Sequence, residues 1–459
     1  MDSIRIPEEL YDQVRTHLFG ASRERFAFML AERSRSAGGW VLLVRDVLLI
    51  PDEEVDQSGY EATLSTSGVL LAVNAAAQSR RVLIEAHAHM GTRPRFSMTD
   101  EAGLKGIVPY MLSSLPSRPY VATVFAGEEV YGRLYEMHGD PRDISSIVVV
   151  GERLVQLVSQ GGPKPADRSR YVRQEILISA QDQKRISRLT IGLVGAGGTG
   201  SICAMQLAYL GFRRFVVIDD QRVERSNLNR TMTAVPGQEG QFKSTLAEEA
   251  ITRIAPDACV EVFREELRSR VVLDRLKGVD VLLGLGDNDG VRLILNELAL
   301  AYAIPYIDLG TGLPNDKGKL LGAGGQVAVV LPGGACLLCM RLIDLEEAGH
   351  ALGDKFQQAW ARNRGYTGQG AGGDPSVVPL NGEIVSAAII ELIMLVTGQR
   401  KVARLLRLDV LGSCEPLPGQ YLRPIRVQQR EDCVHCPLAW SGEASGIERY
   451  AVPASEATP

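Results

Sequence analysis

The sequence of 459 residues contains no run of about 18 or more apolar residues, so it predicts no membrane-spanning helix. The N-terminus lacks the charged and then apolar pattern of a secretory signal, and we expect the protein to be cytoplasmic. The net charge of −5 argues against a general nucleic-acid-binding protein. Cysteine and histidine are scarce, with seven and six residues. Four of the cysteines nevertheless form two Cys-x-x-Cys pairs, which in a cytoplasmic protein favour metal binding over disulfides.

Apolar patterning divides the chain into two expected α/β domains. Residues 1–158 should form the first domain, and the segment 159–169, which contains Gly and Pro, should be a linker. Residues 170–442 should form the second domain, followed by a small, polar and disordered tail at 443–459. In the first domain the sequence predicts helices at 8–18 and 23–32, and strands at 40–50, 82–84, 119–125 and 130–137.

The second domain begins with a pattern of strand, glycine-rich turn, helix and strand. The strands are expected at 189–194 and 215–218, with an apolar helix at 201–210 between them. Such a βαβ unit predicts a mostly parallel, doubly wound sheet of the Rossmann type. A later segment, 384–395, is apolar nearly all round and should form a buried helix.

A metal-ligating pattern follows the predicted strand at 82–84. His87 and His89 are followed by seven residues, Ser97, two residues and Asp100. Two histidines and a carboxylate can hold a zinc ion and leave its fourth position for water, which is the layout of a catalytic site. Zinc lowers the pKa of that water to roughly 7. The alternatives are two ordinary exposed histidines, or a site that has kept its residues and lost its activity.

A hydrolytic zinc site also needs a general base, and Glu24 is favoured over Glu32 because it stands at the head of a predicted helix. Ser97 would donate a hydrogen bond to the developing oxyanion. With these residues the segment resembles the JAMM (MPN-type) zinc metalloproteases, although Ala88 and Met90 stand where that family prefers Ser and Pro. The resemblance implies a JAMM-like α/β domain that cleaves peptide or isopeptide bonds after the C-terminal glycine of a ubiquitin-like protein.

The glycine-rich turn of the second domain suits a nucleotide. It reads Gly195-Ala196-Gly197-Gly198-Thr199-Gly200, and backbone amides at the start of the following helix can bind phosphate oxygens. Asp219, about 20 residues further on, suits a ribose hydroxyl. Dehydrogenases share these features. The cations Arg230 and Lys243 suit a triphosphate, however, and the carboxylate of Asp287 suits Mg²⁺.

Together these motifs resemble the ThiF/MoeB and ubiquitin-activating adenylyltransferases over nearly all of the second domain. The resemblance implies that the glycine loop cradles the phosphates of ATP, that Asp219 holds the ribose and that Asp287 serves Mg²⁺. It also implies that Arg173 reaches into the site of a neighbouring subunit, which would make the protein a homodimer. Gln221 and Thr231 depart from the family, which often has Asp and Gln there. The nucleotide contacts implied in this way are Gly195, Gly197, Gly198, Gly200, Asp219, Asn227, Arg230, Lys243, Asp287 and Asn288.

The two cysteine pairs are Cys336 with Cys339, and Cys433 with Cys436. The resemblance implies that these four thiolates surround one structural zinc, a closed site that leaves no position for water. Their spacing alone also allows two independent pairs without metal. His435 lies inside the second pair and is not expected to be a ligand.

Activating enzymes often carry a nucleophilic cysteine after the first pair, but residues 340–383 contain none. Two hypotheses follow. Either the reaction stops at the acyl-adenylate, or a hydroxyl of Thr367 or Ser376 forms an oxyester, although no activating base is evident. Each of the other three cysteines is expected to be a small, buried apolar side chain. They are Cys203, Cys259 and Cys414.

The sequence therefore predicts a bifunctional enzyme of a bacterial-type ubiquitin-like pathway. The second domain would use ATP and Mg²⁺ to adenylate the C-terminal carboxylate of a ubiquitin-like or sulfur-carrier protein that ends in Gly. The first domain would use zinc to cleave after that glycine. A ubiquitin-conjugating-like protein is a further expected partner, whereas nucleic acid and membrane are not. The alternatives are sulfur-carrier activation in cofactor or cysteine biosynthesis, peptide tailoring by adenylation, and a scaffold with one decayed site.

Overall fold

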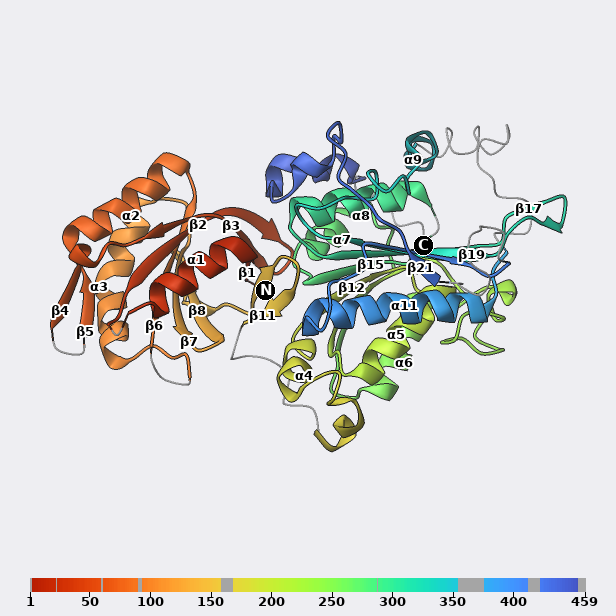
Figure 1. The fold of residues 1–459 in the computed structure, drawn as a ribbon, viewed down its shortest axis with the longest axis horizontal. Helices are drawn as coiled ribbons and strands as arrows, with labels where there is room; N and C mark the ends of the chain where they lie inside the picture. The colour runs from red at the N-terminus through yellow and green to blue at the C-terminus, as the bar shows by residue number, and fades with distance from the viewer. Residues whose placement is uncertain are drawn as a thin grey trace. The chain divides into compact units, whose positions relative to one another are not determined.

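The chain folds into two compact units, Met1–Gly162 and Pro163–Pro459, and each has its own sheet (Figure 1). The division falls within the segment 159–169 that the sequence predicts as a linker. The computed structural model describes residues 2–21, 23–58, 61–89, 93–157, 168–286, 288–353, 375–411 and 422–452.

The first unit is built on a nine-stranded mixed sheet. Its strands are β1 (Ser3–Pro7), β2 (Phe26–Ser36), β3 (Gly39–Leu49), β6 (Val82–Ala88), β7 (Tyr120–Ala126), β8 (Glu129–Tyr135), β9 (Arg142–Asp143), β10 (Ser146–Val150) and β11 (Leu154–Gln156). Their order across the sheet is β11, β10, β1, β3, β2, β6, β7, β8 and β9. A separate hairpin consists of β4 (Val55–Ser58) and β5 (Glu61–Leu64).

Helices cover both faces of this sheet. Helix α1 (Glu8–Phe19) contributes to one hydrophobic cluster, which includes Met29 of β2. Helices α2 (Thr66–Ser79) and α3 (Met98–Ser114) contribute to a second cluster, which includes Phe28. Because successive side chains of a strand point to opposite faces, the two clusters lie on opposite sides of β2.

The predicted helix at 23–32 is wrong, because this segment leads into the central strand β2. The six residues from Phe26 to Ala31 are all buried, since both faces of the strand are covered. A continuous apolar run lacks the alternation of a half-exposed strand, and its periodicity does not separate a buried strand from a buried helix. The other elements predicted in this unit are present as α1, β3, β6, β7 and β8.

The second unit is built on an eight-stranded sheet with helices on both faces. Its strands, in order across the sheet, are β14 (Cys259–Phe263), β13 (Arg214–Ile218), β12 (Thr190–Val194), β15 (Val281–Gly284), β16 (Tyr306–Gly312), β19 (Gly324–Val330), β20 (Leu405–Asp409) and β21 (Leu422–Pro424). The first five run parallel, and the last three extend the sheet antiparallel. A hairpin of β17 (Asn315–Asp316) and β18 (Lys319–Leu320) stands apart from it.

The helices of the second unit are α4 (Ala180–Ile186), α5 (Gly198–Leu210), α6 (Lys243–Ile254), α7 (Arg270–Leu276), α8 (Asp289–Ala301), α9 (Leu345–Leu352) and α11 (Val378–Thr397). Helices α5, α6 and α11 lie on one face of the sheet, and α7 and α8 lie on the other (Figure 1). This arrangement confirms the predicted mixed α/β, Rossmann-type fold.

Helix α11 is long and apolar enough to cross a membrane by length and composition alone. Within the unit, however, 78% of its apolar window is buried, and the helix packs on α5, β16 and β19. It is therefore a core helix, as the apolar pattern at 384–395 predicts.

The described part of the C-terminal segment differs from the predicted disordered tail. Residues Gly442–Ser445 and Ile447–Tyr450 form two short 3₁₀ helices. The side chains of Arg449 and Tyr450 both bond to the carboxylate of Glu297 on α8. These polar contacts keep the segment ordered, although its composition alone is typical of disorder. Residues 453–459 lie outside the described part of the chain.

Candidate functional sites

The first unit brings the three predicted zinc ligands and the predicted general base together. One ligand atom each of Glu24, His87, His89 and Asp100 lies within 4.8 Å of all the others. The Nε2 atom of His89 is 3.2 Å from Oδ2 of Asp100, and Nε2 of His87 is 3.6 Å from Oδ1 of the same carboxylate. Two imidazole nitrogens and carboxylate oxygens form a donor set that fits zinc.

Strand pairing explains how Glu24 reaches this cluster. Strands β2 and β6 are antiparallel, and Phe26 pairs directly with His87, so the residues just before β2 lie beside the end of β6. The alternative base, Glu32, lies further along β2 and forms an ion pair with Arg81 instead. Burial raises the pKa of Glu24, while the neighbouring histidines oppose that shift.

Helix α3 positions Asp100. Its N-cap is Ser97, whose Oγ accepts a hydrogen bond from the Asp100 amide at 3.1 Å. The carboxylate of Asp100 in turn accepts from the Ser97 amide at 2.5 Å, which completes a capping box. The predicted oxyanion donor is therefore also a helix cap, and its hydroxyl proton is left for a second partner.

His87 is 2% exposed, and neither of its ring nitrogens has a hydrogen-bond partner in the described residues. Carboxylate oxygens lie 3.5–3.6 Å from both nitrogens, and a metal ion at Nε2 would supply the short contact that this nitrogen lacks. Sequence reasoning missed the group on the other side of the ring: a carboxylate oxygen of Glu85 is 3.5 Å from Nδ1. A carboxylate there can orient a metal-binding histidine, and its position two residues before His87, on the same face of β6, is the signal that was available.

The second unit contains a cavity of about 860 Å³ at the carboxyl ends of its parallel strands. Most of the predicted nucleotide contacts line it. They are Gly195, Gly197, Gly198, Asp219, Asn227, Arg230, Lys243 and Asn288. Gly200 does not line the cavity: a Cβ there would collide with the carbonyl oxygen of Gly195, so this glycine allows α5 to begin against the loop.

Asp219 is aimed at the glycine loop. Its Oδ2 accepts a hydrogen bond from the Ala196 amide at 2.6 Å, and its Oδ1 accepts from the Gln221 amide at 2.8 Å. Burial raises the pKa of this carboxyl group, although both amides counteract the shift. A carboxylate held at this strand end lies where a dinucleotide-type fold contacts a ribose.

Two cations face the same cavity. Lys243 opens α6, and its Nζ donates a hydrogen bond to Oε1 of Gln221 at 2.7 Å. The partner of this lysine, Gln221, is neutral, and it stands where the family often has Asp. Arg230 donates from one guanidinium nitrogen to the carbonyl of Ser226 at 2.7 Å and to Oδ1 of Asn229 at 3.1 Å. Neither cation is paired with a carboxylate in these contacts, which leaves their charge for phosphate.

The resemblance places Arg173 in the site of a neighbouring subunit and not in that of its own chain. Arg173 lies in the 3₁₀ turn Val172–Gln174, is exposed and does not line the cavity. Asp287 and Thr367 lie outside the described residues. Sequence reasoning also missed two cavity residues, Thr311 at the end of β16 and Asn381 in the first turn of α11.

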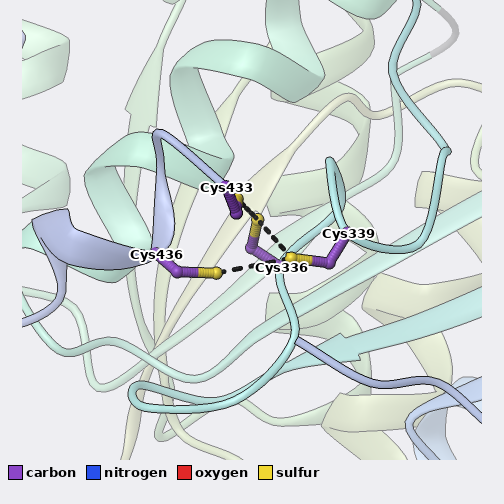
Figure 2. Close-up of side chains that lie close together, drawn as sticks. All are labelled: Cys336, Cys339, Cys433 and Cys436. Atoms are coloured by element: carbon purple, nitrogen blue, oxygen red, sulfur yellow. Dashed lines mark hydrogen bonds between the residues drawn. The ribbon is translucent and has the colours of Figure 1, made fainter. Parts of the chain in front are cut away.

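The four cysteines of the two pairs come together beside α8 (Figure 2). The Sγ atoms of Cys336 and Cys433 are 3.6 Å apart, and those of Cys339 and Cys436 are 3.5 Å apart. These distances exclude disulfides and fit a tetrahedral zinc, whose bonds of about 2.3 Å place sulfurs about 3.8 Å apart. The two pairs are therefore not independent, because all four thiols belong to one cluster.

One buried amide connects both pairs to helix α8. Asn296 accepts a hydrogen bond at Oδ1 from the Leu337 amide at 2.9 Å, and its Nδ2 lies 3.2 Å from Nδ1 of His435. Leu337 belongs to the first cysteine turn and His435 to the second. His435 is outside the ligand cluster, as expected, and instead contacts the helix.

The remaining cysteines differ in exposure, and this predicts a difference in reactivity. Cys203 on α5 is fully buried, as expected, and burial raises the pKa of its thiol to about 12. Cys259 at the start of β14 is exposed, so the prediction of a buried side chain is wrong there. Cys414 lies outside the described residues.

At pH 8 we expect iodoacetamide to label Cys259 and to leave Cys203 unmodified, because only the thiolate reacts. Peptide mass spectrometry of the folded chain would measure both, and equal labelling of the two would contradict the burial argument.

The second unit is similar to proteins of a known family. Residues 171–433 match the ThiF family. The "SAMP-activating enzyme E1" of Haloferax volcanii is 30% identical over 173 residues, which are 37% of this chain and 61% of that protein. The "sulfur carrier protein adenylyltransferase" of Thermus thermophilus is 30% identical over 162 residues, or 35% of this chain and 56% of that protein. The chain therefore spans less than two thirds of either curated relative.

Among solved structures, Escherichia coli MccB with ATP aligns with a TM-score of 0.45 at 14% identity, covering 60% of this chain and 75% of that one. The family match begins at residue 171, so the first unit lies outside it.

Proposed function

Because this chain belongs to the ThiF family, we propose that its second unit adenylates the C-terminal carboxylate of a small carrier protein with ATP. The observation that supports this most strongly is the cavity in which the glycine loop meets Asp219, Arg230 and Lys243. The Haloferax relative is named a SAMP-activating enzyme and the Thermus relative a sulfur carrier protein adenylyltransferase. Activation of a sulfur-carrier protein is therefore better supported than the conjugation pathway that the sequence analysis placed first.

The proposed reaction needs charge stabilisation and no proton transfer. A carboxylate oxygen of the carrier attacks the α-phosphorus of ATP, the bond to the bridging oxygen breaks, and the electron pair leaves with pyrophosphate. The glycine loop and the N-terminus of α5 line the cavity, where their backbone amides would bind the phosphates. Lys243 and Arg230 neutralise the negative charge of the leaving group, while Asp219 holds the ribose.

ATP–pyrophosphate exchange tests this proposal directly. The assay would use small β-grasp proteins that end in Gly and are encoded near this gene. We expect exchange that requires one of these proteins, and the matched control is the same protein without its terminal glycine, which should support none. Exchange that is independent of every carrier, or absent with all of them, would contradict the proposal.

We further propose that the first unit is a zinc peptidase that cleaves after the carrier's C-terminal glycine. The cluster of Glu24, His87, His89 and Asp100 supports this proposal. Zinc at this cluster would supply Lewis acidity to a water and to the scissile carbonyl. The two histidines and Asp100 would hold the ion, and Glu24 would accept the proton of the attacking water.

Replacing Glu24 with glutamine should lower the rate of this cleavage by about 10²-fold or more, because a general base contributes that much. The substrate would be a carrier extended by a few residues beyond its glycine, followed by mass spectrometry. Glu32→Gln is the matched control, since Glu32 lies on β2, which Glu24 precedes, and pairs with Arg81. Equal activity of the two variants, with zinc content unchanged, would remove Glu24 from the mechanism.

A further inference from the structure

Asn381 is a buried amide at the wall of the nucleotide cavity. It lies in the first turn of α11, is 1% exposed and lines the cavity with Thr311 and Ser376. The hydroxyls of both neighbours donate to its Oδ1, from Thr311 Oγ1 at 2.9 Å and from Ser376 Oγ at 3.2 Å. These two donors fix the amide, so Nδ2 must point away from them.

The free end of this amide lies against the glycine loop. A Cβ built on Gly198 would lie 2.5 Å from Nδ2 of Asn381 and 3.3 Å from Cγ of Arg230. Nδ2 therefore lies where the loop and Arg230 meet, and none of the described residues accepts a hydrogen bond from it. A buried amide with a fixed acceptor end and an unused donor end is arranged to meet a ligand.

The position of Asn381 indicates which part of the ligand it meets. Asp219 marks the ribose end of the cavity, and Lys243 and Arg230 carry the charge suited to phosphates. Thr311, Ser376 and Asn381 form a neutral group, which suits an acyl oxygen better than a phosphate. The cations among the described cavity residues are Arg222, Arg230, Lys243 and Arg292. Arg222 donates to the Gly240 carbonyl, Lys243 donates to Gln221, and the Arg292 guanidinium is engaged by Asp289 and Asp308.

We propose that Nδ2 of Asn381 donates a hydrogen bond to the acyl oxygen of the substrate's C-terminal residue. This inference rests on the proposed adenylation and names the group that recognises the carboxyl end. One carboxylate oxygen attacks phosphorus, and the other becomes the carbonyl oxygen of the acyl-adenylate. The second oxygen is an acceptor before and after the step, so Nδ2 of Asn381 keeps its hydrogen bond throughout. Asn381 is then a catalytic residue, and the hydroxyls of Thr311 and Ser376 position it.

The test is a comparison of two ligands that differ only in the acyl group. The probes are 5′-O-(N-glycylsulfamoyl)adenosine, which mimics a glycyl-adenylate, and 5′-O-sulfamoyladenosine, which lacks the glycyl group. Calorimetry with the full chain should show that Asn381→Ala weakens the glycyl ligand by about 10- to 100-fold. Binding of the ligand without the glycyl group should change by less than about threefold.

Two further variants keep the test informative. Thr311→Val removes one of the two hydroxyl donors and should give a smaller loss, again confined to the glycyl ligand. Asn315→Ala, in the exposed turn of β17, is a matched control that should bind both ligands as the wild type does. Should Asn381→Ala not fold, Asn381→Ser supplies the same comparison.

The possible outcomes separate the two proposals. Equal weakening of both ligands by Asn381→Ala would assign this residue to the nucleotide or to packing and overturn the inference. No weakening of either ligand would also overturn it. A wild-type protein that binds neither ligand would reject the adenylation itself.

Discussion

Replacing Lys243 with methionine should reduce ATP–pyrophosphate exchange by about 10²- to 10³-fold, the loss expected when one group that stabilises transition-state charge is removed. Methionine keeps most of the length of the side chain and removes only the charge. The ammonium lines the cavity and has the neutral Gln221 as its hydrogen-bond partner, so its charge is available for the departing pyrophosphate. We expect most of the loss in kcat, because charge accumulates on the leaving group as the bond breaks.

Lys319→Met is the matched control for this substitution. Lys319 is exposed on β18 and does not line the cavity, so exchange should continue at the wild-type rate. If Lys243→Met instead raised only the KM for ATP, the lysine would contribute to ground-state binding alone. Unchanged kcat and KM would remove it from the site.

Replacing Cys336 with serine should release one equivalent of zinc from the second unit and lower its unfolding free energy by at least about 4 kcal/mol. Cys336 is fully buried and its Sγ lies within 3.9 Å of two other cysteine sulfurs. A serine hydroxyl is a poor zinc ligand, and the loss of the metal removes the bonds that join the two cysteine pairs. Metal analysis would give the zinc content, and calorimetry of the full chain would give the unfolding transitions.

Cys259→Ser is the control for the loss of a thiol, because Cys259 is exposed and outside the cluster. It should leave both the zinc content and the unfolding transitions unchanged. An unchanged zinc content in Cys336→Ser would mean that the four cysteines do not hold the metal.

The local sequence predicts the parts of the sites that have short, fixed spacing. His87, His89 and Asp100 lie within 14 residues of sequence, and the strand and helix cap that carry them bring them together. The sequence assigns Glu24 to a helix, whereas it lies just before β2, and the antiparallel pairing of β2 with β6 brings it beside His87. A continuous apolar run identifies burial and leaves the type of element undecided.

The contacts that sequence reasoning missed join segments far apart in the chain. Asn381 meets Thr311, 70 residues before it, and Gly198, which is more distant still. No periodicity of α11 marks this amide, because its neighbours are set by the order of strands in the sheet. The same holds for Glu297, whose carboxylate holds a C-terminal segment that is polar enough to resemble a disordered tail.

A metal bound by the cysteine cluster would also restrict the conformations of the unfolded chain. Cys336 and Cys433 are 97 residues apart in sequence, and a metal that joins them closes a loop containing α9, α11 and β20. Polymer theory gives roughly 4 kcal/mol for the free-energy cost of the conformational entropy lost when a loop of that length is closed. An unfolded chain that holds zinc between one thiolate of each pair has already lost part of that freedom. The strongly apolar helix α11 would then fold into the core from within a closed loop, with fewer conformations available to the chain around it.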